Sequence, residues 1–116
     1  MSRILKGEIY LANLSPTVGS EISKTRPVLI VSNDVNNQYA ATVSIVPITS
    51  TTSKIYPFEV FLPKGEGSLI NDSKAKCNQI RTIDKQRIEK RFGTVSESKL
   101  TEIEDAILTH LGINKK

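Results

Sequence analysis

Alternating hydrophobic and polar positions predict a chain made mostly of short β-strands. Residues 8–12 alternate polar and apolar side chains, which predicts a half-buried strand. Residues 27–31 form a β-branched apolar run between turn residues, which predicts a strand buried on both faces. Residues 42–48 alternate again, and Pro47, which lacks an amide donor, requires a bulge or an edge position there. Further strands are predicted at residues 58–62, 75–81 and 92–95.

Helical periodicity is clear only near the C-terminus. One apolar stripe follows the spacing of a helix face and consists of Leu100, Ile103, Ile107 and Leu111. Ser96 suits the N-cap of this helix, and Gly112 is placed to end it. Shorter helical turns are predicted around residues 36–39 and 85–88. Many short strands with one packing helix indicate a small, strongly curved sheet or open barrel covered by that helix.

The bulk composition limits the size of the core and the classes of partner. The 116 residues match one domain spanning 1–116, without repeat or linker. A hydrophobic fraction of 38% and the lack of Trp make the core lean, so a second subunit would add stability. The net charge of +4 permits a polyanionic partner but does not require one.

Two features indicate a cytoplasmic protein. The single cysteine, Cys77, excludes an intrachain disulfide and is interpreted as a small buried residue. Residues 1–6 are too short and too polar for a signal peptide, and no apolar run approaches the roughly 20 residues of a membrane span. We therefore expect no membrane association.

The sequence lacks the residues that several classes of catalytic site require. The single histidine, His110, lies beside the helix stripe and is interpreted as a surface or interface residue. No His or Cys spacing suits a metal site, and no close acidic pair suits a two-metal nuclease. No glycine-rich phosphate-binding loop is present, so neither metal nor cofactor is expected. What remains is three polar clusters at strand ends.

The first cluster is the loop of residues 19–27. Arg26 lies where the chain enters a buried strand, so packed neighbours would hold its guanidinium in place. A fixed guanidinium suits phosphate recognition and stabilises charge on a phosphorane. The alternative is a structural arginine paired with Glu21.

The second and third clusters carry hydroxyl, amide and guanidinium groups. Residues 47–53 include Thr49 and Ser50, whose hydroxyls could donate to phosphate oxygens or simply form a turn. In residues 77–85, strand alternation would place Asn78 with Ile80 on one face, and Gln79 with Arg81 on the other. Such side chains can read base edges of single-stranded RNA, or they form a solvated sheet face.

The ordered clusters resemble the MazF/PemK family of toxin endoribonucleases over nearly the whole chain. The matching segments are residues 6–14, 19–21, 25–34, 46–50 and 78–87, with the C-terminal helix. The resemblance implies an SH3-like plugged β-barrel with a C-terminal helix, assembled as a homodimer. It also implies metal-independent cleavage of single-stranded RNA at short preferred sequences, and inhibition by a cognate antitoxin that covers the RNA groove. We expect the helix to pack on the barrel rather than form the whole dimer interface.

The resemblance also implies roles for individual residues. Arg26 and Thr49 match the catalytic pair, with Arg26 stabilising the phosphorane and Thr49 bonding a non-bridging oxygen. The substrate 2′-hydroxyl would attack its own phosphodiester and leave 2′,3′-cyclic phosphate and 5′-hydroxyl ends. Arginine stays protonated, which leaves the general base open. The predicted RNA-binding residues are Ser20, Glu21, Lys24, Ser50, Asn78, Gln79 and Arg81.

Two departures from the family pattern concern the cut sequence more than the chemistry. Residues 22–24 replace glycines found in many relatives, and residues 74–77 are unusually polar. Two other functions remain open: a toxin of the same fold that poisons DNA gyrase, and a catalytically silent binding module. RNA cleavage would exclude the first, and loss of activity in Arg26→Ala would exclude the second. The RNA target class and the antitoxin's identity are left open.

Overall fold

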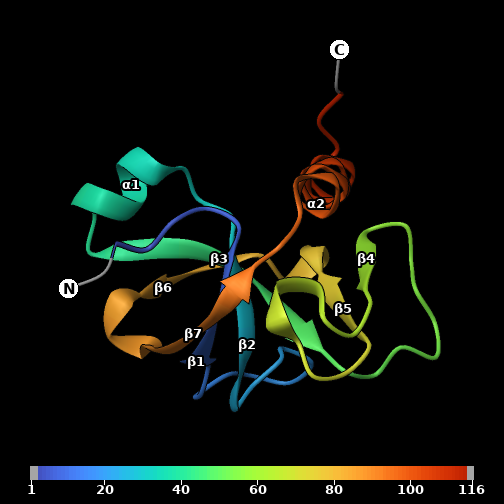
Figure 1. Cartoon of the computed structure of the whole chain (residues 1–116), viewed down its shortest axis with the longest axis horizontal. Coiled ribbons are helices and arrows are strands. Elements are labelled where there is room, and N and C mark those ends of the chain that lie inside the picture. The colour runs from blue at the N-terminus through green and yellow to red at the C-terminus, as the bar shows by residue number, and fades with distance from the viewer. Residues whose placement is uncertain (1–2, 115–116) are drawn as a thin grey trace.

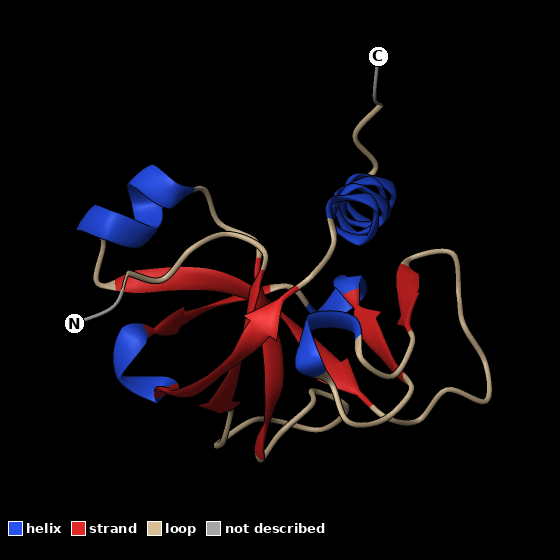
Figure 2. Ribbon diagram, viewed as in Figure 1, coloured by secondary structure: helices blue, strands red, loops and turns tan. Residues whose placement is uncertain are grey.

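The computed structural model describes residues 3–114, which form one antiparallel β-sheet with helices on its surface (Figures 1 and 2). The strands are β1 (Glu8–Asn13), β2 (Thr25–Ile30), β3 (Thr42–Thr49), β4 (Glu59–Leu62), β5 (Ser73–Lys76), β6 (Arg81–Asp84) and β7 (Ile88–Thr94). The helices are α1 (Asp34–Tyr39) and α2 (Glu97–Leu111), with 3-10 turns η1 (Glu66–Ser68), η2 (Cys77–Gln79) and η3 (Lys85–Arg87). No helix within the described range is long and apolar enough to cross a membrane.

The sheet is strongly curved but open. Its strand order is β4-β5-β3-β2-β1-β7, and β6 pairs with β3 beside that path. Within residues 3–114 the two end strands, β4 and β7, do not pair with each other. The mainly β architecture with a C-terminal helix is therefore confirmed, whereas a closed barrel is not.

The central strands are buried on both faces, as predicted for residues 27–31. Leu29 belongs to the core between the sheet and α2, whereas Val28 and Ile30 belong to a second core on the opposite face. Ile83 of β6 is buried in that second core, and the loop residue Ile22 packs against it. Two cores on one thin sheet require it to curl, because each apolar face must be covered.

The strand predicted at residues 8–12 is confirmed as β1, but the prediction that it is half-buried is wrong, because both of its faces are buried. Glu8 and Tyr10 are 6% exposed, and the Tyr10 hydroxyl donates to Glu8 Oε1 at 2.8 Å. Arg91 Nε donates to Glu8 Oε2 at 2.6 Å, and the Leu5 amide donates to Oε1 at 2.7 Å. Burial alone would raise the pKa of Glu8, but these hydrogen bonds hold it below its usual value. Burial and the Glu8 carboxylate raise the pKa of Tyr10 to about 12.

The prediction that residues 75–81 form one continuous strand is also wrong. The chain leaves β5, turns through η2 and enters β6, so two short strands replace one. β3 pairs with β6 up to Ile45 and with β5 from Ile48 onward. Pro47 lies at this junction, so an interior strand accommodates the proline where one of its ladders is interrupted. The last strand, β7, begins earlier than predicted, at Ile88.

Helix α2 has the predicted caps and packs on the sheet. The Ser96 hydroxyl accepts from the Lys99 amide, and Gly112 closes the helix with a φ of 70°. The stripe residues that contact the first core are Leu100, Ile103 and Ile107. Leu111, the last stripe residue, is 53% exposed and does not join that contact. Helix α1 and turn η3 occupy the two predicted helical turns.

Candidate functional site

The ends of β2 and β3 form a pocket of about 380 Å³, here called the strand-end pocket. Arg26, Thr49 and Ser50 line it together with residues of the segment 69–73. The paired register sets Val28 opposite Pro47. Arg26 lies two residues before Val28 along β2 and Thr49 lies two residues after Pro47 along β3, just beyond the last paired residues of these strands. The two residues predicted as the catalytic pair are thus brought to one pocket by strand pairing.

The Arg26 guanidinium is held from one side. Its Nε donates to the Ser23 carbonyl at 2.9 Å, and the residue is half-buried. Its two terminal nitrogens have no hydrogen-bond partner within residues 3–114. The alternative pairing with Glu21 is absent from that range, where the Glu21 carboxylate instead accepts from the Val18 amide at 2.6 Å. The guanidinium fork can therefore donate to a phosphate in the strand-end pocket.

The hydroxyl hydrogen of Thr49 has no acceptor within residues 3–114. Its Oγ1 accepts from the Thr51 amide at 3.3 Å, which leaves the hydroxyl hydrogen free to donate. The backbone around Thr49 is fixed because it pairs with Lys74 of β5. The strand-end pocket thus combines a guanidinium fork and a hydroxyl donor, two groups that suit an anionic oxygen.

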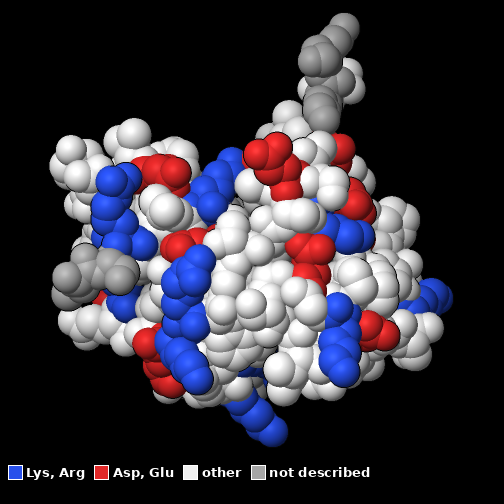
Figure 3. Space-filling view, viewed as in Figure 1, with Lys and Arg blue, Asp and Glu red and all other residues white. Residues whose placement is uncertain are grey.

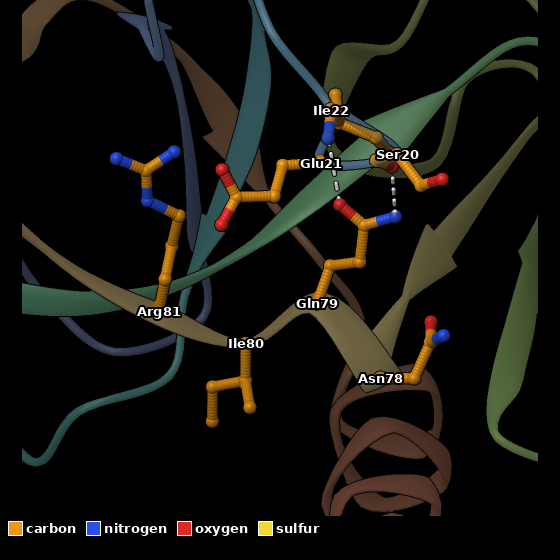
Figure 4. A pocket seen from close by; sticks show the side chains of 7 residues that line it. All are labelled: Ser20, Glu21, Ile22, Asn78, Gln79, Ile80 and Arg81. Carbon is orange, nitrogen blue, oxygen red and sulfur yellow. Dashed lines mark hydrogen bonds between the residues drawn. The ribbon is translucent and has the colours of Figure 1, made fainter. Parts of the chain in front are cut away.

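A second pocket of about 350 Å³ lies between the loop of residues 20–22 and the segment 78–81, and is here called the loop pocket (Figure 4). Gln79 joins its two walls: its Oε1 accepts from the Ile22 amide at 2.7 Å and its Nε2 donates to the Ser20 carbonyl at 3.4 Å. In Figure 4 the side chains of Glu21 and Arg81 extend on the same side of Gln79.

The prediction that Asn78 and Ile80 share one strand face, with Gln79 and Arg81 on the other, is wrong. The 3-10 turn η2 replaces the expected strand over Cys77–Gln79. Gln79, Ile80 and Arg81 all line the loop pocket. Asn78 also borders it but extends on the other side of Gln79 in Figure 4. The buried Asn78 Oδ1 has no hydrogen-bond partner among the described residues. Arg81 Nη1 donates to the Leu14 carbonyl at 3.3 Å, so part of its guanidinium is occupied by the protein.

Lys24 lies outside both pockets, and its backbone closes the loop between β1 and β2. It has a φ of 71°, and its amide donates to Ser15 Oγ at 2.8 Å. Its carbonyl accepts from the Leu14 amide at 3.0 Å. The exposed Lys24 side chain makes no hydrogen bond within residues 3–114, so its predicted contact with RNA stays a prediction.

The segment of residues 69–73 was missed from the sequence. It contributes Ile70 and Asn71 to the strand-end pocket, and Ile70 is 76% exposed. Phe92 of β7 also lines this pocket. The only local signal in this segment is an Asn-Asp pair typical of a turn, which does not indicate where the turn lies in the fold.

A buried ion cluster lies beside Thr49. The Glu59 carboxylate accepts from Lys74 Nζ at 2.9 Å and Lys76 Nζ at 2.8 Å. Lys74 Nζ also donates to the Lys54 carbonyl at 2.7 Å, which anchors the loop between β3 and β4. Burial would raise the pKa of Glu59, but hydrogen bonds from Lys76, the Tyr56 amide and Lys74 lower it.

Neither Cys77 nor the charge distribution on the face in Figure 3 offers a second site. Burial and the nearby Glu59 raise the pKa of the Cys77 thiol to about 12, so it stays protonated near neutral pH. On that face basic and acidic side chains are interspersed rather than gathered into one basic patch. Residues 3–114 contain no group of three or more His, Cys, Asp or Glu side chains arranged to hold a metal ion. His110 is exposed, which agrees with its interpretation as a surface residue.

Comparison with known proteins places the chain in one family. Residues 5–111 match the model of the PemK-like, MazF-like toxins of type II toxin–antitoxin systems. The endoribonuclease MazF of Staphylococcus epidermidis is 41% identical over 96% of this chain and 93% of its own length. These matches confirm the predicted family and the predicted enzyme class.

Solved structures agree with this fold. MazF from Deinococcus radiodurans superposes with a TM-score of 0.86 at 24% identity, covering 97% of this chain and all of that one, and supports the fold alone. An endoribonuclease in complex with its cognate antitoxin, from a mycobacterial species, gives a TM-score of 0.80 at 26% identity, covering 97% and 99%. The chain therefore belongs to the PemK-like, MazF-like toxins of type II toxin–antitoxin systems.

Proposed function

We propose that this toxin cleaves single-stranded RNA, messenger RNA above all, in the strand-end pocket, by attack of a 2′-hydroxyl on its own phosphodiester. The products are a 2′,3′-cyclic phosphate and a 5′-hydroxyl end. The observation that carries the proposal is the meeting of Arg26 and Thr49 at one pocket, with the terminal guanidinium nitrogens and the Thr49 hydroxyl proton free to donate.

The roles follow from the charge that develops during the reaction. The phosphorane gains negative charge on its non-bridging oxygens, and donors fixed before the reaction stabilise it most. Arg26 supplies a charged fork, and Thr49 supplies one hydroxyl donor. The nucleophile belongs to the substrate, so the proposed reaction uses no protein nucleophile and no metal. Arginine stays protonated, so another group or water takes the 2′-hydroxyl proton. The bond between phosphorus and the 5′-oxygen breaks, and the leaving 5′-oxygen takes up one proton from water or from another group.

The loop pocket extends the proposed RNA path beyond the scissile phosphate. The chain joins the two pockets: residues 20–22 line the loop pocket, Ser23 and Lys24 follow, and the first residues of β2 line the strand-end pocket. The groups proposed to contact flanking nucleotides are Ser20, Glu21, Lys24, Ser50, Asn78, Gln79 and Arg81. Polar side chains on a short path suit single-stranded RNA, whose base edges are accessible.

We further propose a cytoplasmic homodimer that is inhibited by a cognate antitoxin covering the RNA path. The mycobacterial relative solved with its antitoxin supports such a partner for this family. The curled sheet with a core on each face supports the SH3-like plugged-barrel arrangement that the resemblance implies. Leu111 and Ile113, each 53% exposed at and just after the end of α2, leave apolar surface that a second subunit could cover.

The test is incubation of the pure protein with unstructured RNA in excess EDTA, beside Arg26→Ala. Discrete fragments ending in cyclic phosphate, made by the wild type only, would support both the activity and the site. No cleavage of several RNA sequences would overturn the proposal. A supercoiling assay with DNA gyrase would then separate the gyrase-directed toxin from the silent binding module.

A further inference from the structure

Two arginines hold three consecutive backbone carbonyls where β1 ends. Arg87 Nη1 donates to the Asn13 carbonyl at 3.0 Å and to the Ser15 carbonyl at 2.6 Å. Arg81 Nη1 donates to the Leu14 carbonyl between them at 3.3 Å. Arg81 borders the loop pocket, whereas Arg87 borders neither pocket described above. Arg87 therefore acts on the loop from outside the proposed site.

The residues held by Arg87 join the two ends of the loop. The Leu14 amide donates to the Lys24 carbonyl at 3.0 Å, and the Lys24 amide donates to Ser15 Oγ at 2.8 Å. The next carbonyl back along the loop, that of Ser23, accepts from Arg26 Nε at 2.9 Å. A continuous series of hydrogen bonds thus leads from Arg87 to the guanidinium of Arg26.

The chemistry of Arg87 suits this task. Arg87 is half-buried, and no carboxylate within residues 3–114 forms an ion pair with it, so its charge is directed at neutral carbonyls. Hydrogen bonds from a charged donor are shorter and stronger than those between neutral groups. A lysine ammonium is a strongly hydrated point charge on a flexible stem and lacks the planar fork, so it holds two carbonyls less well.

We propose that Arg87 is a positioning residue for RNA cleavage, which fixes the loop of residues 14–24 and through it the Arg26 guanidinium. This inference rests on the proposed function. Misplacing a reacting or stabilising group by about 1 Å costs a rate on the order of 100-fold. Removing the Arg87 side chain is therefore expected to slow cleavage by that order while Arg26 and Thr49 stay in place.

The test compares wild type, Arg87→Ala, Arg87→Lys and Arg3→Ala. Arg3 is exposed and makes no hydrogen bond or ion pair within the described residues, so its variant controls for the lost positive charge. Single-turnover cleavage at saturating protein measures the rate, and thermal unfolding verifies the fold. Amide hydrogen exchange of Leu14, Ile22 and Lys24 in the free protein reports the loop directly. Added ethylguanidinium tests rescue of Arg87→Ala.

The expected result is slow cleavage and fast loop exchange in Arg87→Ala, partial recovery in Arg87→Lys or with ethylguanidinium, and wild-type behaviour in Arg3→Ala. Wild-type cleavage by Arg87→Ala would overturn the inference, as would slow cleavage with unchanged loop exchange. If the wild type itself failed to cleave RNA, the proposed function and the catalytic part of this inference would both fall. Unchanged exchange in Arg87→Ala would additionally show that Arg87 does not hold the loop.

Discussion

Arg26 of β2 and Thr49 of β3 each lie two residues beyond Val28 and Pro47, the last residues that pair the two strands, and both line the strand-end pocket. The relationship depends on strand register, because a slip of one strand by one residue would turn its side chain to the other face of the sheet.

Arg26→Ala and Thr49→Ala should each lose most RNA cleavage without unfolding. Removing one donor to a developing oxyanion typically costs on the order of 100- to 1000-fold in rate. Neither side chain belongs to a core cluster, so the midpoint of thermal unfolding should change little. Cleavage assays and thermal melts would be run beside Thr101→Ala, an exposed threonine on α2. Normal cleavage by either site variant would remove that residue from the catalytic pair.

Two substitutions of Gln79 should separate the hydrogen bond that its side chain accepts from Ile22 from the one that it donates to Ser20. Gln79→Glu keeps an oxygen for the Ile22 amide but loses the bond to the Ser20 carbonyl, whereas Gln79→Leu loses both. We expect exchange of the Ile22 amide to be slowest in the wild type, faster in Gln79→Glu and fastest in Gln79→Leu. The cut-site preference should change in both variants. Equal exchange in all three proteins would show that Gln79 does not hold the loop in solution.

Acid should destabilise the protein partly through Glu59. Its pKa in the folded protein is lowered from 4.5, so its contribution to stability is present above that pH and is lost as the pH falls through the lower folded value. Glu8 adds an effect of the same sign. Glu59→Gln should show a shallower loss of unfolding free energy below about pH 4.5. It should also be less stable near neutral pH by about 3 kcal/mol, because two ammonium groups lose their counter-charge.

Urea unfolding over a series of pH values measures this effect. Glu102→Gln is the control, because the Glu102 side chain is 52% exposed and, among residues 3–114, forms an ion pair with Lys99 alone. The same acid dependence in Glu59→Gln and in the wild type would contradict the assignment.

Gly93→Ala should destabilise the contact between β7 and η1. A Cβ at Gly93 would lie 2.8 Å from the Gly67 carbonyl oxygen and 2.6 Å from Ser68 Oγ. The backbone atom cannot swing away as a side chain can, so we expect a loss of about 1–3 kcal/mol in unfolding free energy. Ser98→Ala, an exposed change on α2, is the comparison in urea unfolding. Unaltered stability in Gly93→Ala would mean that η1 moves freely.

The candidate site was predictable in composition but not in arrangement. Arg26, Thr49 and the polar residues of the third cluster are visible as polar groups at the ends of strand-like segments. Their division into two pockets is not visible. The alternation expected in the third cluster is broken by the turn η2, so that Asn78, Gln79, Ile80 and Arg81 all line the loop pocket. The sequence around Arg87 does not indicate its role, because the carbonyls that it binds, those of Asn13 and Ser15, lie 74 and 72 residues earlier in the chain.

Local patterns were sufficient for the strand-rich architecture, the capped helix α2 and the family, because apolar spacing, capping residues and short ordered motifs act over a few neighbouring positions. They were insufficient for the burial of Glu8, which depends on Arg91 reaching it from the paired strand β7 as well as on Tyr10 of its own strand. The meeting of Arg26 with Thr49 and the closure of the loop by Arg87 likewise required the folded chain. Strand register and long-range hydrogen bonds decide these contacts, and both are properties of the whole sheet rather than of any one segment.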